Sequence, residues 1–96
     1  MKMVMISYNE AVDEEMTEAL EKLGVDGYTK WINVLGRGTT GGEHLGSHVW
    51  PGKNCVLFLA VDEEKKQEII EEVKALRKTA GHEGIKAFVV PLEEIT

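Results

Sequence analysis

The stretch that decides the fold is CVLFLAV at residues 55–61, seven consecutive hydrophobic residues. Because both alternate sets of positions are apolar, this run predicts a strand that is buried on both faces. Asp62 follows directly and is a suitable N-cap for a helix that we expect to extend to about Lys78. The expected buried stripe of this helix consists of Ile69, Ile70, Val73 and Leu76.

The N-terminal half predicts a second helix between two further strands. Asn9 is a suitable cap for a helix that ends near Leu23, where Gly24 supplies the usual stop. The expected buried face of this helix consists of Val12, Met16, Ala19, Leu20 and Leu23. The four expected strands are residues 2–8, 28–35, 55–61 and 85–90.

The resulting order, βαββαβ, predicts an α+β fold over a single domain of residues 1–96. It is the order of a ferredoxin-like sandwich, a four-stranded antiparallel sheet with two helices on one face. Two helices cover only one face, yet the strand at residues 55–61 is apolar on both. The uncovered face would be a larger apolar patch than monomers usually expose. We therefore expect copies of the chain to associate, and closed cyclic assemblies are the common outcome.

Composition excludes several classes of function. The chain of 96 residues carries a formal net charge of −6, which argues against nucleic-acid binding and against adhesion to an anionic membrane. No apolar stretch approaches the roughly 20 residues needed to span a bilayer, so we expect no membrane insertion. Cys55 is the single cysteine and is expected to act as a small apolar residue. No secretory signal pattern precedes the first strand, and we expect a cytoplasmic protein.

Residues 36–54 differ in composition from the rest of the chain, because they hold six of its ten glycines and two of its three histidines. A loop of this length in a compact domain is usually functional or disordered. Gly36, Arg37 and Gly38 at a strand end can cradle a phosphate or carboxylate, with Arg37 or Lys86 supplying positive charge. The alternative for the glycines is a flexible turn.

The same segment contains two further candidate sites. His44 and His48 lie four residues apart beside Glu43, and this donor set suits zinc, copper or nickel. The alternative is a pair of solvated histidines or partner contacts. Trp50 is a candidate anchor for a partner protein, since aromatic side chains dominate binding hot spots. Its alternative role is to pack the loop against its own sheet or a neighbouring subunit.

Three segments together resemble the PII signal-transduction family. They are ALEKLGVDGYT at residues 19–29, VLGRG at residues 34–38 and GIKAFVVPLEEI at residues 84–95. The resemblance implies a homotrimer that binds effectors, usually adenine nucleotides, in clefts between subunits. It also implies that residues 36–54 are a T-loop that contacts a regulated transporter or enzyme. By position, the residues that would line the cleft are Thr29, Gly36, Gly38 and Lys86, with Arg37 where the family more often has an apolar residue.

We therefore expect a PII-like regulator, and not an enzyme, whose effector is ATP, ADP, AMP or another anion. The loop lacks the modification tyrosine of nitrogen-sensing members, which points to the divergent PII-like relatives. A first alternative is a sensor or tolerance module for a divalent transition metal, similar to the trimeric CutA family and using the loop histidines. A second is a structural trimer that binds only protein. No nucleophile elbow, Walker loop or metalloprotease motif supports catalysis.

Overall fold

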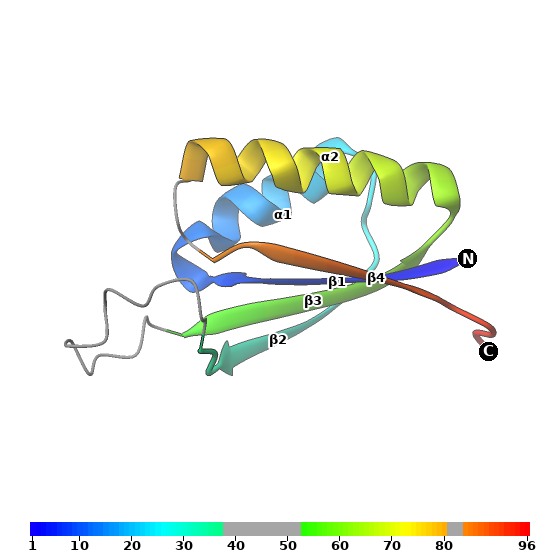
Figure 1. The fold of residues 1–96 in the computed structure, drawn as a ribbon, viewed down its shortest axis with the longest axis horizontal. Helices are drawn as coiled ribbons and strands as arrows, with labels where there is room; N and C mark the ends of the chain where they lie inside the picture. Colours follow the sequence, from blue (N-terminus) through cyan, green and yellow to red (C-terminus); the bar gives the residue numbers. More distant parts are fainter. Residues whose placement is uncertain (38–52, 81–83) are drawn as a thin grey trace.

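A computed structural model describes residues 1–37, 53–80 and 84–96 of the chain (Figure 1). Its elements are β1 (Lys2–Asn9), the short 3-10 helix η1 (Glu10–Val12), α1 (Asp13–Lys22), β2 (Thr29–Val34), β3 (Asn54–Val61), α2 (Glu63–Ala80) and β4 (Lys86–Pro91). The predicted βαββαβ order is confirmed, whereas η1 was not expected. Asn9 does act as an N-cap, but it caps η1: its Oδ1 accepts a hydrogen bond from the Ala11 amide at 2.8 Å.

The four strands form one antiparallel sheet in the order β2-β3-β1-β4, and both helices cover the same face of it (Figure 1). This arrangement confirms the ferredoxin-like fold. Tyr8 at the end of β1 lies opposite Cys55 at the start of β3, and Ser7 lies opposite Lys86 at the start of β4. The end of β1 and the starts of β3 and β4 therefore meet at one end of the sheet.

The hydrophobic core lies between the sheet and the helices. Val4, Ile6 and Tyr8 alternate along β1 and are fully buried, as the period of two along a strand requires. The expected face of α1 is buried except for Leu23, which is half-buried. In α2, the side chains of Ile69 and Val73 are buried while those of Ile70 and Leu76 are half-buried. Each fully buried side chain of this kind contributes about 1.5–3 kcal/mol.

The helix ends confirm the predicted stop and cap. Gly24 has a φ of 81°, and the Val25 amide bonds the carbonyl of Leu20 at 2.9 Å, which is the pattern of a Schellman motif. At the start of α2, Asp62 Oδ1 accepts a hydrogen bond from the Lys65 amide at 2.7 Å. Within residues 1–37, 53–80 and 84–96, no helix has both the length and the apolar character needed to cross a membrane.

The sheet face opposite the helices, which we call the bare face, is apolar, and no other element within residues 1–37, 53–80 and 84–96 covers it. Phe88 is 52% exposed, Trp31 50% and Val90 48%, and the Trp31 and Phe58 rings contact each other with centroids 4.9 Å apart. By strand alternation the bare face consists of Met3, Met5, Ser7, Thr29, Trp31, Val56, Phe58, Ala60, Lys86, Phe88 and Val90. The prediction that residues 55–61 are buried on both faces is therefore wrong for the single chain. The positions of β3 on the bare face are only half-buried, because no described part of the chain forms a second layer over them.

Candidate functional site

The predicted effector residues lie on both edges of the sheet. Thr29 begins β2, and Gly36 and Arg37 follow its other end, while Lys86 begins β4 on the opposite edge. Three strand spacings separate the two edges, which is about 14 Å. The residues predicted for one cleft therefore do not form a single cleft within one chain.

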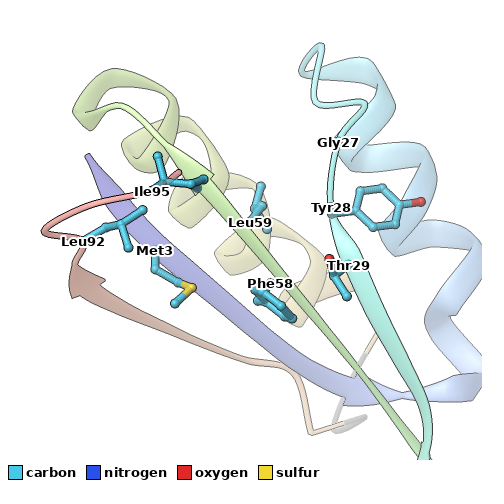
Figure 2. A pocket seen from close by; sticks show the side chains of 9 residues that line it. Met3, Gly27, Tyr28, Thr29, Phe58, Leu59, Leu92 and Ile95 are labelled. Carbon is cyan, nitrogen blue, oxygen red and sulfur yellow. The ribbon is translucent and has the colours of Figure 1, made fainter.

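Thr29 lines an open pocket of about 480 Å³ (Figure 2). The side chains of Met3, Leu92 and Ile95 lie on one side of this pocket and Thr29 on the other, with Phe58 between them. The full lining is Met3, Gly27, Tyr28, Thr29, Phe58, Leu59, Ala60, Leu92 and Ile95. The side chains that line the pocket are mostly apolar, and Tyr28 and Thr29 are the two that carry a hydroxyl group. The pocket suits a flat apolar ring that also has hydrogen-bonding atoms.

A bulge sets the direction of the chain at the end of β2. Trp31 pairs with Val56 and Val34 pairs with Asn54, so three residue steps on β2 match two on β3. Asn33, within this interval, has a φ of 60°, a left-handed conformation that Asn tolerates better than most residues. An additional residue reverses the faces of the positions that follow it. Val34 thereby shares a face with Asn54, and Gly36 lies against the Asn54 side chain.

The start of β4 is held at two points beside Lys86. Ile85 is buried in the core, and Arg77 of α2 donates from Nε to the Ile85 carbonyl oxygen at 2.8 Å. Lys86 itself is exposed and pairs with Ser7 of β1 on the bare face. Its ammonium group is therefore available to an anion while its backbone is fixed.

Sequence reasoning missed a polar cluster beside β2, formed by Tyr8, Asp13 and Lys30, which we call the Asp13 cluster. The Tyr8 hydroxyl donates to Asp13 Oδ1 at 2.5 Å, and Lys30 Nζ donates to the two Asp13 carboxylate oxygens at 2.9 and 3.1 Å. Tyr8 is fully buried, whereas the ion pair is partly exposed. A signal was present in the sequence: Lys30 interrupts an otherwise apolar set of strand positions, and such a charge needs a partner.

The Asp13 cluster shifts the pKa of each of its members. Burial, together with the hydrogen bond to Asp13, raises the pKa of Tyr8 far above its usual value. Burial also acts to raise the pKa of Asp13, but hydrogen bonds from Tyr8 and Lys30 outweigh it and hold that pKa below its usual value. The hydrogen bond to Asp13 raises the pKa of Lys30. The charges of the cluster are thus fixed near neutral pH, which suits a structural role and not proton transfer.

Several predicted residues lie outside the described part of the chain. These are Gly38, the metal candidates Glu43, His44 and His48, and the partner candidate Trp50. Their roles stay predictions, as do the metal-binding and purely structural alternatives. Within the described residues, no three His, Cys, Asp or Glu side chains gather in a way that could hold a metal. Cys55 is buried, and burial raises the pKa of its thiol, as expected for a small apolar residue.

Two helices on one face of a four-stranded antiparallel sheet define a small ferredoxin-like domain, and comparison with known proteins identifies its family. The family described as Nitrogen regulatory protein P-II matches the chain over residues 1–96. The Nitrogen fixation nifHD region GlnB-like protein 1 of Methanothermococcus thermolithotrophicus is 27% identical over 95 residues, which is 98% of this chain and 90% of that protein.

Solved structures of a nitrogen regulatory PII-like protein, CPII from Thiomonas intermedia K12, share the fold. The complex with ADP, AMP and bicarbonate aligns with a TM-score of 0.69 and 24% identity, over 98% of this chain and 94% of that one. The complex with ADP, AMP and acetate aligns with a TM-score of 0.69 and 25% identity, over 92% and 81% of the two chains.

The chain belongs to the P-II family, which confirms the resemblance seen in its sequence. It is a PII-like signalling protein, and PII-like proteins are regulatory proteins.

Proposed function

We propose that this chain binds an adenine nucleotide in a cleft between two of its copies, and that the bound nucleotide controls its contact with a regulated transporter or enzyme. The observation that carries the proposal is the position of the candidate residues on opposite edges of one sheet. A second copy can bring the β2 edge of one subunit beside the β4 edge of another.

The bare face gives the copies a reason to associate. Its aromatic and aliphatic side chains are about half exposed in one chain, and burial removes them from water at roughly 25 cal/mol per Å². Closed rings are the usual outcome of such association, and we propose the homotrimer that the family resemblance implies. Each subunit would then contribute both edges, one to each of its two neighbours.

The chemistry of the two edges suits the two parts of a nucleotide. The apolar pocket beside Thr29 fits an adenine ring, with the hydroxyl available to the ring's polar edge. Arg37 and Lys86 are exposed cations, and the glycine backbone at Gly36 allows a phosphate or carboxylate to approach closely. The CPII complexes contain ADP and AMP together with a small anion, bicarbonate or acetate, which supports the same ligand class here.

Calorimetry with ATP, ADP and AMP tests nucleotide binding. We expect Lys86→Met to weaken binding by about 10-fold or more, because a charge-assisted hydrogen bond contributes about 1.5–3 kcal/mol. Lys74→Met is the matched control, since Lys74 is an exposed lysine on α2, away from the bare face. Absence of heat with all three nucleotides would rule out the nucleotide form of the proposal.

A mixing experiment tests whether the cleft lies between subunits. Thr29→Arg places a large charged side chain in the pocket that Thr29 lines from the β2 edge, and Lys86→Glu reverses the charge on the β4 edge. Neither variant by itself should bind ADP. When the two are unfolded and refolded together, random assembly should restore about a quarter of the clefts. If both residues served the same cleft within one subunit, mixing would restore none.

Regulation of a partner follows from where the nucleotide would bind. Gly36 and Arg37 lie at the start of the segment between β2 and β3. The family resemblance makes this segment the one that contacts the partner, so a ligand bound at Gly36 and Arg37 would lie next to the partner contact. We expect retention of the partner on immobilised protein to change when ADP is added. Equal retention with and without ADP, in a protein that binds ADP, would remove the regulatory part of the proposal.

A further inference from the structure

Lys30 makes the contact between edge strand β2 and the helical layer. None of the six side chains of β2 is buried, and only those of Lys30 and Val34 are partly buried. Lys30 pairs with Leu57, a fully buried residue, so its side chain lies on the helical face. Ile32 is the next position on that face, but it lies in the bulge and is 63% exposed. The apolar anchoring that the central strands have is therefore missing from β2.

The Asp13 cluster supplies that anchoring through three different elements. Lys30 on β2 donates to both carboxylate oxygens of Asp13, the first residue of α1. Tyr8, buried on the central strand β1, donates to the same carboxylate. The Asp13 carboxylate is thus held from the core side by a buried hydroxyl and in turn holds the ammonium group of the edge strand.

An exposed ion pair alone would contribute little, typically 0.2–1 kcal/mol. The Asp13 cluster differs because its carboxylate is already positioned by a buried hydroxyl, so less side-chain entropy is lost when Lys30 binds. Its effect on global stability is still small, yet β2 has no other polar or apolar side-chain anchor on the helical face among the described residues. Edge segments with few buried contacts open locally without global unfolding.

We propose that Lys30 is a positioning residue: through Asp13 and Tyr8 it fixes β2 against the helical layer and so determines where Thr29 and Gly36 are presented. Thr29 directly precedes Lys30 and faces the opposite side of the sheet. Gly36 follows the same strand beyond the bulge. The link to a nucleotide rests on the proposed function, whereas the anchoring of β2 does not.

Hydrogen exchange by mass spectrometry, without ligand, tests the anchoring. In Lys30→Met, which keeps the aliphatic stem but removes the charge, the amides of β2 should exchange about 10-fold faster while those of β1 and β4 are unchanged. Lys30→Arg should restore slow exchange because its guanidinium can still bind the carboxylate. Lys74→Met is the matched control. Unchanged exchange in β2, or equal acceleration in every strand, would overturn the inference.

Calorimetry with ADP then tests whether Lys30 positions Thr29 and Gly36 for nucleotide binding. Lys30→Met should weaken ADP binding about 3- to 10-fold, and Lys30→Arg should restore it. If the wild-type protein binds ADP and Lys30→Met binds it equally well, positioning by Lys30 is wrong. If the wild-type protein binds no nucleotide, the proposed function fails, and the exchange experiment still decides whether Lys30 anchors β2.

Discussion

A Cβ atom on Gly36 would lie 2.6 Å from Nδ2 of Asn54, closer than two such atoms approach in folded proteins. The close approach exists because the bulge in β2 brings Gly36 onto the face of the sheet that Asn54 occupies. Glycine at this position therefore has a packing reason that is independent of any ligand.

Gly36→Ala should lower the free energy of unfolding by about 1 kcal/mol or less, because the terminal amide of Asn54 can rotate away from the new methyl group. Asn54→Ala in the same chain should remove most of that loss. Urea unfolding of the two single variants and the double variant gives the coupling between them. A loss from Gly36→Ala that is the same with and without Asn54 would contradict the contact.

Val90→Glu should dissociate the proposed assembly. Val90 is half exposed on the bare face, and a carboxylate buried there against another subunit would lack a partner, at a cost of several kcal/mol. Sedimentation velocity should show single subunits at concentrations where the wild-type protein is assembled. Ala75→Glu is the matched control, because Ala75 is exposed on α2, on the opposite side of the sheet. An assembled Val90→Glu variant would mean that the bare face is not the interface.

The parts of the fold set by local rules could be predicted from the sequence. The stripe of α1 follows from helical spacing at Met16, Ala19 and Leu20, and all three are buried. Gly24 predicts the stop because glycine commonly ends a helix in a left-handed conformation, and its φ of 81° confirms this. The apolar bare face also followed from the sequence, because two helices cannot cover both faces of a sheet.

Features set by pairing between distant segments could not be predicted in this way. The bulge at Asn33 depends on the register between β2 and β3, and the residues beside it include no glycine to signal it. The Asp13 cluster requires that residues 8, 13 and 30 meet in space, and many acidic residues in the chain are alternative partners for Lys30. Thr29 and Lys86 were selected by resemblance, but their separation across the sheet appears only in the folded chain.

Arg77→Ala should destabilise the protein by about 1–2 kcal/mol, because it removes a charged donor from the Ile85 carbonyl oxygen. The effect should be concentrated at the start of β4, where exchange of backbone amides should become faster. Lys78→Ala is the matched control, since Lys78 also lies in the last turn of α2 and its loss removes the same charge near the helix terminus. Equal losses in the two variants would indicate a helix-dipole effect and not the bond to Ile85.

The Asp13 cluster should make stability fall at both ends of the pH scale. The pKa of Asp13 is lowered in the folded state, so its contribution is complete above the usual 3.8 and is lost as pH falls through the folded pKa. The pKa of Tyr8 is raised, so its contribution is complete below the usual 10.0 and is lost as pH rises beyond it. Cys55 and Lys30, which face Tyr8 and Asp13, also have raised pKa values, so they add to the loss of stability at alkaline pH. The charge of Glu10 also contributes to the raised pKa of Cys55. Urea unfolding between pH 2 and 11 tests both contributions. The free energy of unfolding should fall less steeply with pH on the acid side in Asp13→Asn, and less steeply on the alkaline side in Tyr8→Phe.

Each substitution should change this slope by at most about 1.4 kcal/mol per pH unit. The change is smaller for the partly exposed Asp13 because water screens its interactions with its partners. If the free energy of unfolding falls as steeply at alkaline pH in Tyr8→Phe as in the wild-type protein, the buried hydroxyl does not control the alkaline loss of stability.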